Sequence, residues 1–370
     1  MSPDVDVAVI GAGVAGLAAA YALRKAGRSV HVFEAANWVG GRMATVRYGG
    51  FGIDTGATRL PDRGRRATWS LLRELGLPRR EVPHIGGAVG VWRDGRVHVL
   101  GVAHPFGWLT GGTSTVGRTY RHGMDTLARV LADRLDVSTG VAIREVIAAP
   151  DQARLVADGA TLNARSVVLA VPAPVAAGLY ANPPPFELAY LDACGYTPTV
   201  RVSCLLDRPL SPPTGRSIHT LLVPAVEGGP LAGLLIDHVR NPELVPAGRG
   251  SVTLLASPAA VDDLFDRPDD DVSARLVGAA ERCLPGLAGA TVGRMVHRFR
   301  AGLLDAAPSA VRLRAAFVER ATGTVDYAGD WVLLRPSAEA AVRAGLLAAR
   351  RVQARPMHRC PPPAVHTRTG

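Results

Sequence analysis

The first 34 residues alternate between apolar and polar positions in a way that predicts strand, turn, helix and strand in that order. Residues 5–10 are a largely apolar run, residues 14–25 place apolar side chains at helical spacing, and residues 29–33 alternate. Gly27 stands where a helix C-cap belongs. The segment is therefore expected to be a βαβ unit with parallel strands.

Further elements follow the same two periodicities. Short apolar runs closed by proline or glycine predict strands, and apolar residues at three- and four-residue spacing predict helices. Strands are expected at 89–92, 96–100, 141–147, 166–171, 199–206, 231–237, 251–255 and 325–328, and helices at 69–75, 124–135, 272–283 and 338–352.

This order of elements predicts the α/β fold class, with a Rossmann-like domain and a second, α+β domain. We expect a discontinuous cofactor domain from residues 1–60, 118–174 and 322–353, and a substrate domain from residues 61–117 and 175–321. The proline-rich residues 354–370 are expected to be a disordered tail.

The turn after the first strand carries a dinucleotide-binding fingerprint. Gly11, Gly13 and Gly16 form G-x-G-x-x-G, and Glu34 ends the second strand roughly 20 residues on. In such a turn the first glycine permits the bend, the second lets the backbone approach a pyrophosphate, and the third lets helix and strand pack closely. Glu34 would accept hydrogen bonds from a ribose. Both FAD and NAD satisfy this pattern.

Composition disfavours several classes of partner and site but does not indicate a function. The net charge is +10, but Lys25 is the single lysine and the arginines are scattered, which disfavours a nucleic-acid partner. No apolar run reaches the roughly 20 residues of a membrane span. The four cysteines are widely spaced, so no metal site or redox dithiol is predicted. A soluble, cytoplasmic protein is expected, with its oligomeric state left open.

A second glycine motif decides between the two nucleotides. Gly40, Gly41 and Arg42 follow Glu34 closely, and this trio resembles the signature of the flavin-dependent amine oxidase superfamily. Residues 40–45 are similar to those of renalase-like members, and the superfamily also includes protoporphyrinogen oxidase-like enzymes. The resemblance implies an FAD-dependent oxidoreductase in which Arg42 lies against the phosphates.

The same resemblance covers about the first 60 residues, residues 118–172 and about 30 residues before the tail. It implies a turn beside the flavin ring, a strand whose backbone pairs with adenine, an aspartate on the ribityl chain, and unpaired helix amides at the pyrimidine edge of the flavin. The residues matched to these four roles are, in order, Gly56, Ala57 and Thr58; Val141 and Ile143; Gly329 and Asp330; and Ala340 and Ala341.

Two departures from related flavoproteins affect the expected chemistry. Residues 284–329 contain no cysteine, so FAD is expected to bind non-covalently. No second glycine fingerprint follows the first, so a separate NAD(P)H domain is not expected. Molecular oxygen is therefore the expected acceptor of electrons from reduced flavin.

Two residues are candidates for catalysis. Many relatives carry a lysine near flavin N5, and residues 197–204 loosely resemble the strand that holds it, which places Arg201 near that position. The alternative is that Arg201 points outward on a half-exposed strand. Trp331 follows Asp330, so it could line the substrate cavity or pack beneath the last helix.

Three functions remain open at this stage. The leading hypothesis is oxidation of a C–N or C–C bond of a small molecule by hydride transfer to FAD, with reoxidation by oxygen. The second is a flavin-dependent desaturase, or a redox-neutral cyclase or isomerase, in specialised metabolism. The third is a flavin-binding scaffold without turnover.

Overall fold

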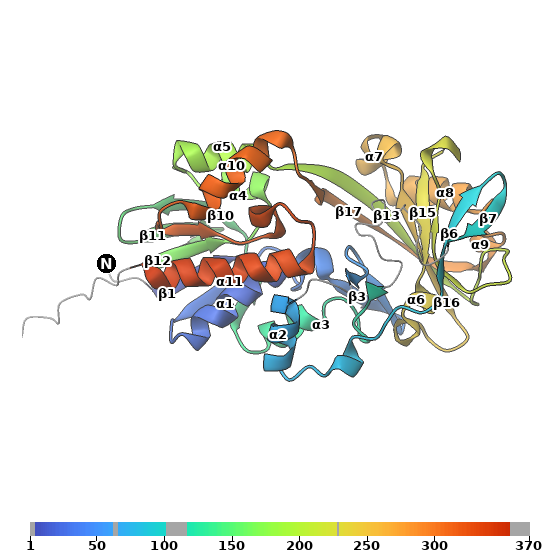
Figure 1. Cartoon of the computed structure of the whole chain (residues 1–370), viewed down its shortest axis with the longest axis horizontal. Helices are drawn as coiled ribbons and strands as arrows, with labels where there is room; N and C mark the ends of the chain where they lie inside the picture. The colour runs from blue at the N-terminus through green and yellow to red at the C-terminus, as the bar shows by residue number, and fades with distance from the viewer. Residues whose placement is uncertain (1–3, 62–65, 101–116, 228, 356–370) are drawn as a thin grey trace, which may run out of the picture.

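The computed structural model describes residues 4–61, 66–100, 117–227 and 229–355 of the 370. The expected tail beyond residue 355, and parts of the expected 61–117 segment, lie outside the described residues. Two halves lie side by side along the long axis, each built around one large sheet (Figure 1). The α/β fold class is confirmed.

The first sheet is parallel at its centre. Its strand order is β10-β11-β12-β1-β2-β9, and β18 pairs with β12. Strands β1, β2, β9, β12 and β18 pair in parallel, and β10 and β11 form an antiparallel edge. The bounds are β1 Val5–Ile10, β2 Val30–Glu34, β9 Asp136–Thr139, β10 Ile143–Ala148, β11 Ala153–Ala157, β12 Ala160–Leu169 and β18 Val325–Tyr327.

Helices cover both faces of this sheet because its central strands are apolar on both sides. Val7 and Val9 face one core, which contains α1, α2, α3 and α11, and Ala8 and Ile10 face the other, which contains α4, α5 and α10. These helices span Val14–Lys25 (α1), Arg66–Glu74 (α2), Thr126–Ala132 (α3), Ala173–Leu179 (α4), Pro185–Ala193 (α5), Pro308–Glu319 (α10) and Ala338–Ala354 (α11).

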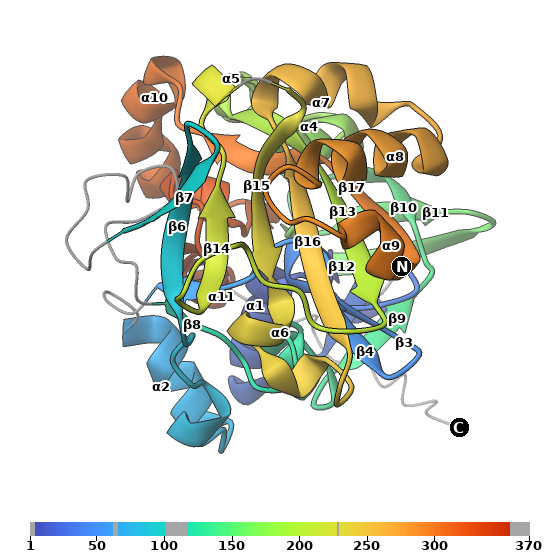
Figure 2. The same ribbon diagram turned by 90° about the vertical axis from the view of Figure 1, so that its right-hand side faces the viewer.

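The second sheet has the order β17-β13-β16-β15-β14-β6-β7, which Figure 2 shows from its outer side. Its strands pair antiparallel except β14 with β6. The bounds are β6 Ala88–Arg93, β7 Arg96–Val99, β13 Gly195–Leu206, β14 Ile218–Leu222, β15 Leu231–Ile236, β16 Gly250–Ala256 and β17 Thr291–Asp305.

The two faces of the second sheet have different neighbours. One face packs a core of β13, β15 and β16 side chains against α7 and α8, with α9 at its end. The opposite face turns toward the first half, where Leu205 of β13 packs on Phe51 and Ile53. The remaining elements are β3 Thr45–Tyr48, β4 Phe51–Asp54, β5 Leu60–Pro61, β8 Gly117–Arg118, α6 Asp237–Arg240, α7 Pro258–Phe265, α8 Asp269–Ala280 and α9 Leu287–Ala290.

A long two-stranded ribbon, β13 with β17, joins the halves (Figure 1). At one end Tyr196 and Leu304 pack in the core of the first half, and further along Val200 and Val202 are buried in the core of the second. The ribbon therefore belongs to both cores.

Helix packing bears on the expected domain boundaries, which remain a prediction. Helices α5 and α10, and α4 from residue 175 on, fall in the expected substrate segment, and their apolar faces pack on the first sheet, with Tyr190 and Phe317 fully buried there. Likewise, Leu71 and Leu72 of α2 pack in the core beneath α1 and α11. Helical faces follow the nearest apolar surface, which here belongs to the first sheet.

No helix in the described ranges is long and apolar enough to cross a membrane. The described cysteines, Cys194, Cys204 and Cys283, are buried free thiols. Among the same residues, no group of three or more histidine, cysteine, aspartate or glutamate side chains could hold a metal ion.

Candidate functional site

A notch lined by glycines lies where β1 meets α1. Gly11 has φ +105°, which a side chain would strain, and a Cβ on Gly16 would stand 2.1 Å from the Gly11 carbonyl oxygen. A Cβ on Gly13, in contrast, would meet no atom within 4 Å. The close packing and the open space therefore fall on the glycines for which the fingerprint requires them.

The notch faces the start of α1. Gly13 is the N-cap residue, no side chain of the described residues caps it, and the first turn contains no acidic residue. The first amides of a helix point at such a space and carry partial positive charge. An open, uncapped helix start is a binding place for a pyrophosphate, so these residues fit a dinucleotide.

Glu34 is held beside this notch at the end of β2. Its Oε2 accepts the Ala12 amide at 2.8 Å and its Oε1 accepts the Ala36 amide at 2.9 Å. Two backbone bonds fix the carboxylate while leaving each oxygen a further lone pair for a hydroxyl. The Val141 amide donates to the Glu34 carbonyl, and β10 begins two residues later at Ile143, so the expected strand starts later than predicted.

Gly40 and Gly41 close the other side of the notch. Gly40 has φ +110° and its amide donates to the Ala12 carbonyl at 2.9 Å. A Cβ on Gly41 would lie 3.6 Å from the Cα of Gly13. The two glycine motifs predicted separately from the sequence thus meet in space.

Arg42 links the glycine notch to the motif of Gly329 and Asp330. Its Nη2 donates to Asp330 Oδ1 at 2.7 Å, and its Nη1 donates to the Gly302 carbonyl at 3.3 Å. Burial alone would lower the pKa of Arg42, but the charge and hydrogen bond of Asp330 outweigh burial and raise it. Arg42 is therefore a fixed cation that joins segments 288 residues apart.

Trp331 lies in the core of the first half. Its side chain is 1% exposed, its Nε1 donates to the Val171 carbonyl at 3.0 Å, and its ring packs against Tyr190, Phe317 and Tyr327. A Cβ on Gly329 would come within 2.4 Å of the Trp331 Nε1, so the indole also explains this glycine. This burial favours the packing role over the cavity-wall role.

The start of α11 departs from the expectation of unpaired amides. Ser337 is the N-cap: its Oγ accepts the Ala340 amide at 3.2 Å, and its carbonyl accepts the Ala341 amide at 3.0 Å. The two amides assigned to a flavin edge are thus paired within the protein in this structure. A serine is a favoured N-cap, and Ser337 stands directly before the expected helix at 338–352.

Arg201 points into the junction between the halves. It lies on β13 on the same face as Ser203 and Leu205, and its Nη1 donates to the Gly56 carbonyl. Gly56 has no room for a side chain, since a Cβ would stand 2.3 Å from the Arg42 carbonyl oxygen, and the next amide, of Ala57, donates to that oxygen at 2.7 Å. The alternative of an outward-pointing Arg201 is therefore wrong.

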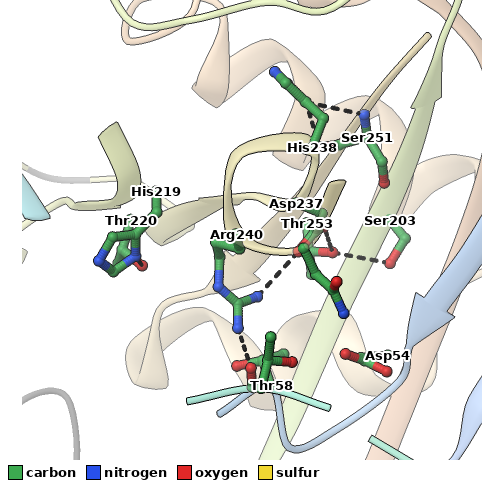
Figure 3. Close-up of polar contacts among 12 residues, drawn as sticks. Asp54, Thr58, Ser203, His219, Thr220, Asp237, His238, Arg240, Ser251 and Thr253 are labelled. Carbon is green, nitrogen blue, oxygen red and sulfur yellow. Dashed lines mark hydrogen bonds and ion pairs between the residues drawn. The ribbon is translucent and has the colours of Figure 1, made fainter. Parts of the chain in front are cut away.

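Asp237 and Arg240, whose charges act on Arg201, form a polar cluster with Thr253 and Ser203 (Figure 3). Arg240 donates to Asp237 Oδ1 at 3.0 Å and to the Thr58 carbonyl, so it ties α6 to the 56–58 turn. Asp237 Oδ2 accepts the Thr253 hydroxyl at 2.7 Å, and Thr253 contacts Ser203 at 3.2 Å.

Electrostatics inside this junction are strongly perturbed. Burial, and then the positive charge of Arg240, lower the pKa of Arg201 to about 10. Burial raises the pKa of Asp237, and it raises that of Asp54 to about 6 although the carboxylate of Asp54 accepts hydrogen bonds from Met124 and Thr45. Perturbed groups at a domain junction are typical of functional sites.

Sequence reasoning missed Asp237 and Arg240. Asp237 ends an otherwise apolar strand pattern, and Arg240 follows three residues later, a spacing that suits an ion pair within one helical turn. A charge directly after a buried strand was the available indication.

The structure thus has two halves, each with one large sheet, with the glycine notch in one half and a buried polar junction against the other. Comparison with known proteins identifies its class. A family model described as flavin containing amine oxidoreductase matches residues 14–108 and 90–353. The chain belongs to this family, and the predictions of an FAD-dependent oxidoreductase and of bound FAD are confirmed at the level of the family.

Individual relatives resemble the chain over different extents. Cyclohexylamine oxidase from Brevibacterium oxydans IH-35A shares the fold with a TM-score of 0.77 and 17% identity, covering 95% of this chain and 99% of that one. Putrescine oxidase bound to putrescine gives a TM-score of 0.75 at 20% identity, with 95% and 99% covered.

The curated relatives match a shorter stretch. Protoporphyrinogen oxidase 2 of Arabidopsis thaliana is 45% identical over 75 residues, which is 20% of this chain and 15% of that protein. The chain spans less than a fifth of the length of the curated relatives it matches.

Proposed function

We propose that the first half binds FAD non-covalently and that the inner face of the second sheet binds a small molecule whose C–N or C–C bond is oxidised, with oxygen as the final acceptor. The observation that carries this proposal is the meeting of three structures at one junction: the glycine notch, the Arg42–Asp330 pair and the contact of Arg201 with Gly56. Bound flavin would supply the two-electron acceptor for the substrate.

Each residue has a separate part in this proposal. Gly13 leaves room for the pyrophosphate and Glu34 accepts ribose hydroxyls. Arg42 supplies positive charge next to Asp330, which would bind the ribityl chain. Arg201 supports the 56–58 turn and presents a permanent cation to the substrate side. Since the substrate is oxidised by positioning against the cofactor, no separate protein acid or base is required.

One observation supports the second candidate, a desaturase or a redox-neutral cyclase or isomerase. Lys25 is the single lysine, and it lies on α1 paired with Glu74, away from the junction. The position that resembles the relatives' lysine holds Arg201, whose guanidinium releases a proton less readily than an ammonium. A slow reaction with oxygen would suit an enzyme that hands electrons elsewhere or returns them to its product.

Anaerobic photometry of the FAD-loaded protein against a metabolite library tests the proposal. A substrate that the protein oxidises reduces and so bleaches the flavin, and admitting air restores the colour. A substrate that is converted without net bleaching supports the redox-neutral candidate. If FAD binds but no pool is bleached or converted, the scaffold without turnover is the better description.

A further inference from the structure

The inner face of the second sheet carries a cation, Arg201, that has no anionic partner among the residues the structure describes. Arg240 pairs with Asp237, but within the described ranges no carboxylate lies at ion-pair distance from Arg201. Its recorded partner is the neutral carbonyl of Gly56, bound through Nη1. A guanidinium has five N–H donors, so donors remain for a ligand.

His297 stands directly across the ribbon from Arg201. The two residues are cross-strand partners of β17 and β13, so their side chains lie on the same face. The His297 Nε2 is buried and has no hydrogen-bond partner among the described residues. Burial and the nearby Arg201 lower the pKa of His297 to about 4, while Asp269 acts weakly in the opposite direction. The imidazole is therefore neutral at pH 7 and has an unused ring nitrogen.

The carboxylates near Arg201 already have other partners. Burial and the proximity of Arg240 lower the pKa of Arg201. The carboxylate of Asp237 already accepts hydrogen bonds from Arg240 and Thr253, and that of Asp54 accepts them from Thr45 and Met124. A buried cation without a counter-charge is costly, and a ligand anion would offset that cost.

We propose that the substrate carries a carboxylate, which binds the free edge of Arg201 and accepts a second hydrogen bond from His297. A carboxylate matches this donor set because its two oxygens accept two N–H groups side by side. Leu255, the cross-strand partner of Arg201 on β16, and Phe299, two residues from His297, give the same face an apolar part for the rest of the molecule. This inference rests on the proposed function and narrows its substrate to organic acids, including amino acids.

The test is ligand binding to the oxidised, FAD-loaded protein, with no turnover needed. Benzoate and 3-phenylpropanoate are titrated while the flavin difference spectrum is recorded, and benzamide and benzylamine serve as a neutral and a cationic comparison. We expect saturable spectral changes with the acids and at least about tenfold weaker binding of the amide and the amine.

Variants separate the two side chains. Arg201→Met should weaken benzoate binding at least about tenfold and leave benzamide binding unchanged, whereas Arg201→Lys, which keeps the charge, should lie between. His297→Leu should weaken benzoate binding less than Arg201→Met, and His297→Gln should recover part of it. Arg300→Met on the same strand, where Arg300 is exposed and paired with Asp266, is the matched control and should bind benzoate normally.

Several outcomes would overturn the inference. Equal binding of benzoate and benzamide would do so, and so would unchanged benzoate binding in Arg201→Met. A shift of the flavin reduction potential in Arg201→Met without loss of benzoate affinity would assign the cation to reduced flavin instead. Failure to bind FAD would contradict the proposed function. Carboxylates would then be tested by thermal shift of the FAD-free protein, where stabilisation by benzoate but not benzamide supports the inference and equal shifts overturn it.

Discussion

The glycine notch and the buried polar junction are built on opposite principles. The notch is made of backbone: Gly11, Gly13, Gly40 and Gly41 act by having no side chain, and the motifs that supply them lie within 31 residues of one another. The junction is made of side chains from strands far apart in the sequence, such as Arg201, Asp237 and His297. A backbone site tolerates almost no substitution, whereas a side-chain site can change its ligand by single replacements.

The largest expected effect tests the backbone half of this comparison. Gly13→Val should abolish FAD binding, because its side chain would occupy the space that is open at Gly13. Bound FAD is measured by absorbance after gel filtration and after acid precipitation. Gly278→Val is the matched control: it also has open space around it, but it lies on α8 in the other half, and it should retain normal FAD. Normal FAD content in Gly13→Val would remove the notch as the cofactor site.

Next come the polar groups that border the notch. Glu34→Ala and Arg42→Met should each weaken FAD binding by roughly 10- to 100-fold, the effect of losing charge-assisted hydrogen bonds of about 1.5–3 kcal/mol. Equilibrium titration of the FAD-free protein with FAD measures the change. If Glu34→Ala or Arg42→Met lost FAD binding as completely as Gly13→Val, side-chain contacts would contribute as much to FAD binding as the open backbone space does.

Arg201→Met tests the side-chain half. It should leave FAD content intact and slow substrate turnover or flavin reoxidation by at least about tenfold, which corresponds to roughly 1.4 kcal/mol. Stopped-flow absorbance separates reduction from reoxidation. Parent rates in both steps would show that the cation supports the 56–58 turn without acting in the reaction.

The last prediction concerns Asp54, where the two halves meet, and its effect is on stability alone rather than on cofactor binding or turnover. Because its folded pKa of about 6 lies above the ordinary value of 3.8, the folded state holds the proton more tightly, and stability should fall as pH rises from about 4 to about 6. Asp54→Asn keeps an Oδ1 acceptor for Thr45 and Met124 but cannot ionise. Above pH 6 it should be more stable than the parent by about 1–3 kcal/mol.

Urea unfolding at several pH values measures that difference. Asp158→Asn is the control, because Arg144 lowers the pKa of this exposed carboxylate and its titration therefore falls below the same pH window. A parent protein whose stability does not change between pH 4 and 6 would contradict the expectation for Asp54.

The same contrast explains what the sequence could predict. Strand β1, helix α1, strand β2 and helix α11 follow local periodicity and were placed to within a few residues, and the glycine motifs lie in contiguous segments. Strand β17 was missed because Arg294, Arg298 and Arg300 break its apolar pattern; Arg298 and Arg300 pair with aspartates of the neighbouring helical segment. The partners of Arg201 depend on strand pairing over long separations, which no local pattern encodes.

The ribbon of β13 and β17 has a consequence for how this enzyme can diverge. Arg201 and His297 occupy paired positions along a ladder that is anchored in a core at each end. Inserting or deleting one residue in the regular part of this ladder, from Thr199 to Leu205, would turn the following side chains to the opposite face of the sheet. The evolutionary freedom of this position therefore lies in exchanging residues at constant length, so homologues with new substrates should differ here by replacement rather than by gaps.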